Sequence, residues 1–329
     1  KLFNNSLRTR MHTFKHKNSN PMQKRNSLIT VCVLVLVTSI GLVSSCKKEN
    51  TNSQQSSTLK YIDAFLTENQ PLAQQYSIST GEGSSIVGQE GTRFEFPKNA
   101  FVSANGTPIT GNVDFELQEI YSAGAMISMD MPTVSSGNIL VSGGEFAMSA
   151  RQNGVDLLLA PGKSIQVKTP TTSLDSSMEL FVGSEQNGSF DWTQEANTEI
   201  TPTIDSNTAY YAFGLINMYR QVNCDYLWGD PRPRTYVDIK LPTGHSPLNT
   251  KVYIYISSIS SIVPVTNWNS NLGQFEIDGG YAQPVGQSVQ FVGIHHTGIN
   301  MQYSLQEVDI VKDHVEVLSF QDATFEELA

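Results

Sequence analysis

Cysteine is scarce in this sequence. Only three occur among 329 residues, and two of them, Cys32 and Cys46, lie in or just after an apolar segment near the N-terminus. The rest of the chain holds a single thiol, Cys224, which cannot form a disulfide within the chain, so its stability must come from a hydrophobic core. No histidine or basic cluster lies near Cys224 in the sequence. We therefore expect Cys224 to be a small buried side chain and not a reactive nucleophile.

Basic residues are also few. The chain has 21 Lys and Arg against 31 Asp and Glu, and seven of the basic residues lie within residues 1–45, which contain no acid. The remaining residues carry 14 basic and 31 acidic side chains, a net charge of −17. Such a surface repels a phosphate backbone and anionic lipid headgroups. We therefore expect no nucleic-acid partner.

Common catalytic motifs are missing as well. The sequence contains no His-Glu-x-x-His, Gly-x-Ser-x-Gly, Cys-x-x-Cys or P-loop pattern, so the chemistries that depend on them have no support, and we predict no catalytic residue, metal ligand or cofactor. The pair His295-His296 is the feature most similar to a metal site. Adjacent residues of a strand point to opposite faces, so we expect instead an edge-strand pair with one ring facing solvent.

Pairs of carboxylates leave one enzymatic alternative open. Glu116 with Glu119, or Asp309 with Asp313, could act as the acid and base of a glycosidase if both faced one cleft. Solvated strand faces are the simpler interpretation of these acids. The alternative function is a secreted hydrolase, active on carbohydrate or peptide, with a β-sandwich scaffold.

An apolar run follows the basic pair Lys24-Arg25. It covers residues 28–43, fewer than the roughly 20 residues that span a bilayer, and it fits the hydrophobic part of a signal peptide. Residues 1–45 are predicted to be the leader, with Met22 as the true start. The sequence VSSC at residues 43–46 resembles the lipobox of bacterial lipoproteins. That resemblance implies acyl chains on Cys46, through which the protein would be attached to a membrane.

Residues 46–58 are predicted to form the lipidated cysteine and a flexible tether. This segment is polar and has no large apolar side chain after Cys46, so it cannot bury enough surface to fold by itself. Lys47 occupies the position where lipoproteins retained in some inner membranes have Asp. The resemblance therefore favours an outer-membrane lipoprotein, in either the periplasmic or the surface-facing leaflet.

Residues 59–80 are predicted to contain a short helix. Leu59, Ile62, Phe65 and Leu66 would lie on one side of it, and Pro71 would end it. From residue 81 onward, short segments alternate apolar and polar residues and are separated by Gly, Pro and Asn. Alternation at period two predicts half-buried strands, and Asn-Gly dipeptides such as that at residues 153–154 predict hairpin turns.

The predicted fold class is therefore all-β. We expect two tandem antiparallel β-sandwich domains of Ig-like or ZU5-like kind, residues 81–205 and 206–329, because the second half repeats the pattern of the first. A hairpin over residues 178–192 would end at Trp192, which is expected to close the core of the first domain.

Residues 92–101 (TRFEFPKNAF) and 111–121 (GNVDFELQEIY) resemble the strand, Pro-x-x-Ala turn and strand of ZU5-type β domains. Together with the segments LVSGGE (140–145), PG (161–162) and NCD (223–225), they are similar to a group of Bacteroidota lipoproteins over most of residues 81–329. These motifs imply packing and turns. Some ZU5 proteins cleave themselves at His-Phe-Ser, but this chain has His-His-Thr at residues 295–297, so that activity is not implied.

A loop rich in aromatic and basic residues offers the candidate contact site. It contains Tyr226, Trp228, Arg232 and Arg234, and two prolines stiffen it. Side chains of these types on a rigid scaffold often bind partners, although a plug over the open end of a sandwich would have the same composition. Our hypothesis is a lipid-anchored cell-envelope protein that acts as a non-enzymatic binding, adhesion or assembly module for a glycan or protein partner.

Overall fold

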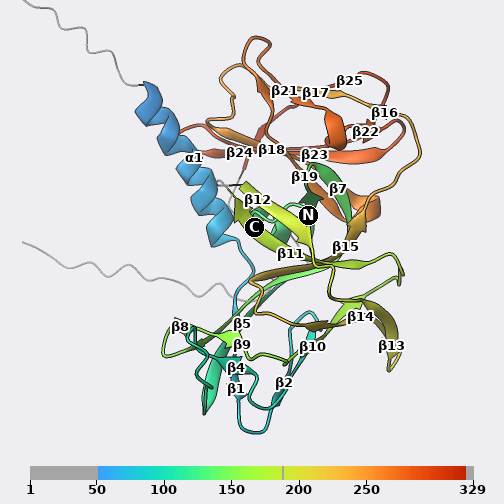
Figure 1. The fold of residues 1–329 in the computed structure, drawn as a ribbon. Coiled ribbons are helices and arrows are strands. Elements are labelled where there is room, and N and C mark those ends of the chain that lie inside the picture. The colour runs from blue at the N-terminus through green and yellow to red at the C-terminus, as the bar shows by residue number, and fades with distance from the viewer. Residues whose placement is uncertain (1–50, 187–188, 324–329) are drawn as a thin grey trace, which may run out of the picture.

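The computed structural model describes residues 51–186 and 189–323 (Figure 1). Strands contain 52% of the described residues and helices 8%, so the all-β prediction is confirmed. Strand β5 (Asn112–Ile120) shows the cause, because the buried side chains of Val113, Phe115 and Leu117 alternate with more exposed polar ones. One face of such a strand packs on a core while the other meets water or a second layer.

Two antiparallel sheets contain most of the strands between Gln74 and Leu227. The larger, eight-stranded sheet has the order β1 (Gln74–Ser79), β5, β7 (Asn138–Gln152), β15 (Gln221–Leu227), β11 (Glu179–Gln186) and β12 (Ser189–Gln194), with β6 (Val134–Ser135) and β8 (Val155–Asp156) beside β7. The five-stranded sheet has the order β13 (Thr201–Asp205), β14 (Thr208–Leu215), β10 (Ile165–Thr171), β3 (Arg93–Phe96) and β2 (Ser84–Val87). A small pair joins β4 (Phe101–Val102) to β9 (Leu158–Leu159).

Two further sheets follow in the chain. The four-stranded sheet has the order β20 (Trp268–Asn269), β21 (Gln274–Ile277), β17 (Val237–Lys240) and β25 (His314–Val317). The other has the order β19 (Ser261–Val265), β18 (Thr250–Ile256), β23 (Ser288–His296), β24 (Met301–Asp309) and β26 (Gln321–Asp322). A small pair joins β16 (Arg234–Thr235) to β22 (Gln283–Pro284). Strands β17 and β25 run parallel, unlike the antiparallel pairing predicted for this half.

The described part of the chain contains few helices, and most of them are short. The predicted N-terminal helix is present as α1 (Thr51–Glu68), which ends before Pro71 and buries Ile62, Phe65 and Leu66. Residues 51–58, assigned to the tether from their polarity, belong to this helix, and they contain neither Gly nor Pro that would interrupt it. The remaining helical elements are α2 (Ala123–Ser128), η1 (Ser257–Ile259) and η2 (Gly279–Tyr281).

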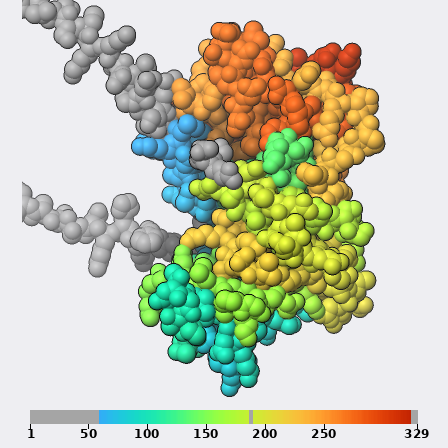
Figure 2. Space-filling model, in the orientation of Figure 1, coloured from blue at the N-terminus to red at the C-terminus, as the bar shows by residue number. Residues whose placement is uncertain are grey.

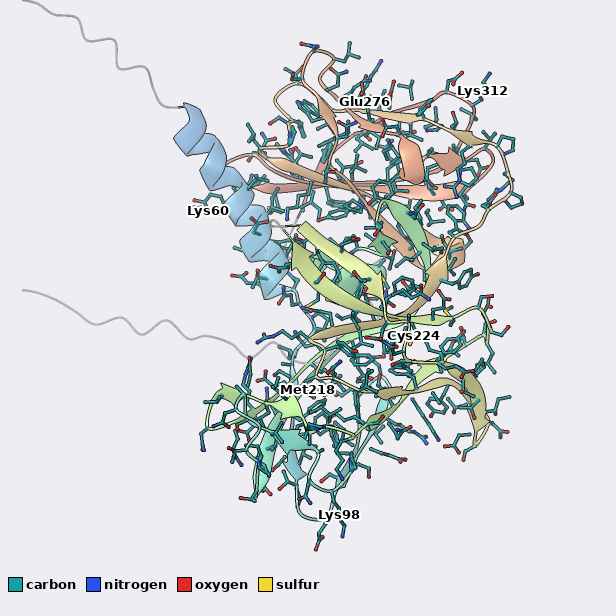
Figure 3. All side chains as sticks on the ribbon, in the orientation of Figure 1. Lys60, Lys98, Met218, Cys224, Glu276 and Lys312 are labelled. Carbon is teal, nitrogen blue, oxygen red and sulfur yellow. The ribbon has the colours of Figure 1, made fainter. Side chains whose placement is uncertain are left out.

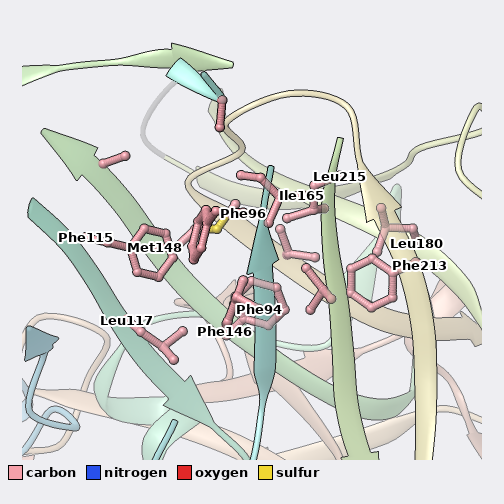
Figure 4. Close-up of a cluster of buried hydrophobic side chains, with 14 of the residues drawn as sticks. Phe94, Phe96, Phe115, Leu117, Phe146, Met148, Ile165, Leu180, Phe213 and Leu215 are labelled. Atoms are coloured by element: carbon pink, nitrogen blue, oxygen red, sulfur yellow. The ribbon is translucent and has the colours of Figure 1, made fainter. Parts of the chain in front are cut away.

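Three groups of buried side chains lie between the sheets. The first core lies between the eight-stranded sheet and the β13–β2 sheet, where Phe94, Phe115 and Phe146 meet (Figure 4). The middle core lies between the eight-stranded sheet and the β19–β26 sheet, and includes Trp192 and Ile294. The second core lies between the β19–β26 sheet and the four-stranded sheet, and includes Phe275, Ile254 and Phe291. The sheets are therefore stacked in layers.

The middle core changes the role predicted for Trp192. This side chain is fully buried, but it packs with residues of α1 and of the later strands and not in the first core. Its Nε1 donates a hydrogen bond of 2.9 Å to the carbonyl of Pro132. Trp192 points away from the first core because β12 presents its alternate residues to the other face of the sheet. Figure 2 shows α1 against the side of the molecule, beside both earlier and later strands.

The domain boundary near residue 205 stays a prediction, but the sheets continue past it. Strand β14 pairs with β10, and β15 pairs with both β7 and β11. Strands that follow residue 205 therefore complete the two sheets that surround the first core. The chain passes to the later sheets only after Leu227, through the loop that carries the candidate contact residues.

Candidate functional site

The loop after β15 connects two of the cores. Tyr226 packs partly against the first core, and Trp228 packs partly against the second. The backbone N–H of Trp228 donates a hydrogen bond of 2.9 Å to the carbonyl of Ile139 in β7. The two predicted aromatic contact residues, Tyr226 and Trp228, are therefore half-buried, and their packing holds the loop against the sheets.

The two predicted arginines are held by the protein itself. The Arg232 Nη2 lies 2.6 Å from the Asp230 Oδ2 and 2.6 Å from the Gln287 Oε1, and its Nε lies 3.0 Å from the Asp230 Oδ1. This contact holds the pKa of Asp230 below its usual value. The Arg234 guanidinium donates to the carbonyl of Ala282 at 2.9 Å and lies 5.3 Å from the centre of the Trp228 ring. Both side chains thus make the loop rigid.

Two exposed apolar residues flank this rigid loop. Leu227 is 54% exposed and Tyr236 is 65% exposed. The sequence does contain a signal for Tyr236. Val237 and Ile239 are the alternate, buried residues of β17, so Tyr236 comes just before this strand, near the turn that leads into it. Sequence reasoning selected the aromatic and basic residues inside the loop and missed the two side chains at its ends. Leu227 and Tyr236 are the exposed large apolar side chains at these ends.

A buried polar cluster lies in the same sheet. Glu145 in β7 is the cross-strand partner of Asn223 in β15, and Asp225 lies two residues beyond Asn223. All three residues have no exposed surface. The Asn223 Nδ2 donates to the Asp225 Oδ2 at 2.6 Å, and the Asp225 Oδ1 accepts from the N–H of Gly143 at 3.3 Å. We call these three residues the Glu145 cluster.

The Glu145 cluster faces the middle core. The other cross-strand neighbours of Glu145 and Asn223 are Ile120 and Phe181, which both belong to that core. Burial raises the pKa of Glu145 well above its usual value, and the nearby Asp225 raises it further. Burial also raises the pKa of Asp225 well above its usual value, although hydrogen bonds from Ser142, Gly143 and Asn223 oppose this. The charged forms of both acids are therefore unfavourable here.

Two glycines allow the strands to approach beside this cluster. The register between β7 and β15 shifts at Asn223 and Asp225. A Cβ at Gly143 would lie 2.7 Å from the carbonyl oxygen of Cys224, and one at Gly144 would lie 2.2 Å from the ring of Tyr121. Gly144 also has a φ of +117°, which side-chain-bearing residues rarely adopt. The sequence segments 140–145 and 223–225 are thus brought together at a bulge.

The single thiol of the body is where we expected it. Cys224 is fully buried in the first core (Figure 3) and its Sγ lies 3.6 Å from the Thr169 Oγ1. Burial raises the pKa of the thiol to about 12. The prediction of a small buried side chain is confirmed, because a thiol in this environment stays neutral.

The histidine pair differs from its prediction. His295 and His296 point to opposite faces, but β23 lies between β18 and β24 and both side chains are buried. His295 stacks on His245, with ring centres 3.7 Å apart, and His296 stacks on Tyr61 of α1, with ring centres 4.5 Å apart. The prediction of an edge strand with one ring facing solvent was wrong, because α1 covers one face of β23.

The carboxylates of β5 do not face one cleft. Glu119 follows Glu116 by three positions in a strand of continuous register, and an odd offset places the two side chains on opposite faces. Glu116 accepts hydrogen bonds from Gln75 and Arg151, both on neighbouring strands. Glu119 accepts from the N–H groups of Glu90 and Thr92 at 2.8 and 2.9 Å. This arrangement gives the hydrolase alternative no support from that pair.

Cys46, the predicted lipidation site, precedes the residues that the structure describes. Within residues 51–186 and 189–323, no helix is long and apolar enough to cross a membrane, and no group of three or more His, Cys, Asp or Glu side chains is arranged to hold a metal ion. No family model and no curated protein sequence matches the chain.

Proposed function

We propose that the chain is a lipid-anchored cell-envelope protein that binds a protein or glycan partner without catalysing a reaction. The lipobox-like sequence before Cys46 and the similarity to Bacteroidota outer-membrane lipoproteins support the anchoring part of this proposal. The binding surface is the segment of residues 227–236, which comprises the end of β15, the loop that follows it and β16, and which connects the strands around the first core to those around the second.

The observation that carries this proposal is the exposure of Leu227 and Tyr236 at the ends of a loop that is otherwise held in place. The loop contains Trp228, Arg232 and Arg234, each fixed by a contact within the protein. A rigid loop loses little conformational entropy when it binds, and exposed Tyr side chains supply large contact areas. Such a surface is suited to recognition.

The net charge restricts the partner. Residues 46–329 carry a net charge of −17, so a neutral or basic partner surface is favoured and an acidic polymer is disfavoured. An aromatic ring beside hydrogen-bonding groups suits both a sugar face and a protein surface. We therefore keep a glycan and an envelope protein as the two partner classes.

Site-specific photo-crosslinking in intact cells tests this function. A photoreactive amino acid placed at position 236 of the full chain is expected to give one dominant adduct. The same amino acid at position 272 serves as the control, because Leu272 is also exposed, at 64%, but lies in the turn between β20 and β21. Leu227→Ala is expected to lower the yield of the position-236 adduct by roughly tenfold, the effect of about 1.4 kcal/mol of binding free energy.

Two outcomes would contradict the proposal. The first is an equal pattern of adducts from positions 236 and 272, which would mean that the loop is not a specific surface. The second is sustained hydrolysis of a polysaccharide or peptide substrate by the purified full chain. Mass spectrometry of the adduct distinguishes a protein from a glycan partner.

A further inference from the structure

The Glu145 cluster contains three buried oxygen atoms that accept no hydrogen bond from the described residues. These are the Oε1 and Oε2 of Glu145 and the Oδ1 of Asn223. Each is an acceptor, and the amide of Asn223 already donates its hydrogen bond to Asp225. Burying a carboxylate without a partner is strongly unfavourable. The cluster therefore needs a proton, a positive charge or a set of donors to be stable.

The oxygen atoms of the cluster match one kind of ligand. The two carboxylates of Glu145 and Asp225 carry two negative charges when ionised, and a divalent cation would neutralise both. One proton on Glu145 would turn one of its oxygens into a donor and provide a single hydrogen bond for the two acceptors that remain, whereas a cation can contact all three oxygens. We propose that Glu145, Asn223 and Asp225 hold a calcium ion between β7 and β15, on the face of the sheet that meets the middle core.

Calcium fits this site better than other divalent metals. The cluster offers only carboxylate and amide oxygens, which are ligands for hard cations, and contains no imidazole or thiolate that would favour zinc or copper. All three residues are fully buried. Magnesium keeps several of its waters when it binds, whereas calcium accepts a large and irregular set of protein oxygens.

The position of the ion gives it a structural effect. It would join β7 to β15 at the bulge beside Gly143 and Gly144. Asp225 lies two residues before Leu227, where β15 ends and the exposed loop begins. An ion at this point would fix the end of the strand from which the loop leaves. The inference does not depend on the proposed binding function, because it concerns the stability of the sheet itself.

Thermal unfolding of the full chain tests the site. The protein is first treated with a chelator to remove bound metal ions. Its Tm at pH 7.5 is then measured before and after the addition of calcium chloride, magnesium chloride, or sodium chloride at equal ionic strength. Calcium is expected to raise Tm by about 5 °C or more at a concentration roughly 100 times its Kd, with a much smaller effect of magnesium. Metal analysis of the desalted protein is expected to find one calcium ion per chain.

Matched variants separate a bound ion from a proton. Glu145→Gln is expected to abolish the calcium-dependent shift. Glu95→Gln makes the same chemical change at an exposed position of β3 and is expected to retain it. Asp225→Asn provides a second variant if Glu145→Gln does not fold. The proposal is overturned if calcium does not raise the Tm of the unmodified chain, if magnesium has an equal effect, or if Glu145→Gln keeps the shift. A protonated cluster would show a higher Tm for Glu145→Gln in chelator and no response to calcium.

Discussion

At the scale of single residues, buried histidine side chains determine how the stability of this protein changes with pH. His295 is buried, stacks on His245 and has its Nδ1 3.0 Å from the Thr250 hydroxyl. Burial lowers the pKa of His295 to about 4, with further lowering by the neighbouring His245 and His296. Burial lowers the pKa of His245 as well. Both rings are therefore neutral in the folded protein at pH 7.

This pair predicts lower stability in acid. Between the ordinary histidine pKa of 6.5 and about 4, the unfolded chain binds a proton at His295 that the folded chain does not. The free energy of unfolding should therefore fall as the pH decreases through this range, by at most about 3 kcal/mol from His295. Urea unfolding at several pH values would measure the slope.

The variant His295→Phe provides the comparison for this prediction. It keeps an aromatic ring for stacking but has no group that titrates, so its unfolding free energy should change less between pH 6.5 and 4 than that of the unmodified chain. In the presence of a chelator, where no cation is bound, Glu145 and Asp225 act in the opposite direction, because their raised pKa values lower stability as the pH increases. The difference between the two proteins removes this shared contribution. Equal slopes would contradict the assignment to His295.

At the scale of elements, α1 illustrates how a local pattern becomes a tertiary contact. The spacing of Ile62, Phe65 and Leu66 predicts one apolar side, and the structure places that side in the middle core. The helix also contacts β23 through the stack of Tyr61 on His296, and Asp63 lies 2.8 Å from the Nζ of Lys251. The salt bridge is partly exposed and contributes little, so the apolar contacts hold the helix.

Removing one of these contacts should destabilise the protein. Phe65→Ala is expected to lower the free energy of unfolding by about 3 to 4 kcal/mol, because it leaves a cavity beside the middle core. Lys60→Ala, at an exposed position of the same helix, is expected to change it by less than about 0.5 kcal/mol. Chemical denaturation of both variants would check this. A loss below about 1 kcal/mol for Phe65→Ala would mean that α1 is not packed as described.

At the scale of the whole molecule, the middle core joins earlier and later parts of the chain. Trp192 and Ile120 come from the eight-stranded sheet, whereas Ile262 and Ile294 come from the β19–β26 sheet. The Thr133 hydroxyl also lies 2.7 Å from that of Ser261. These contacts make the stacked sheets depend on one another, so the earlier and later strands do not behave as separate sandwiches on a flexible linker.

Attachment to a membrane is also a property of the whole molecule. Cys46→Ser is expected to move the protein from the membrane fraction to the soluble fraction, because the acyl chains on Cys46 would supply its hydrophobic anchoring. Cys32→Ser, in the predicted leader, is the matched control and should leave the distribution unchanged. Fractionation at high salt measures both, and continued membrane association of Cys46→Ser under these conditions would contradict lipidation.

Local sequence patterns determined the fold class, the helix near the N-terminus and the burial of Cys224. Period-two alternation is a property of a few neighbouring residues, so it indicates strands such as β5 and turns such as that at residues 153–154 without knowledge of the rest of the chain. The helical spacing of Ile62 and Phe65 is equally local.

Only the tertiary structure decided which strands are neighbours and which faces are covered. It placed Glu145 beside Asn223 and Asp225. It gave Arg232 and Arg234 hydrogen-bond acceptors within the protein, and it covered both faces of β23. Alternation specifies that one face of a strand is apolar, but not which layer packs on the other face, because that depends on strand pairing between residues far apart in the chain. The prediction that one ring of the pair His295-His296 faces solvent was wrong for this reason, and both rings are buried.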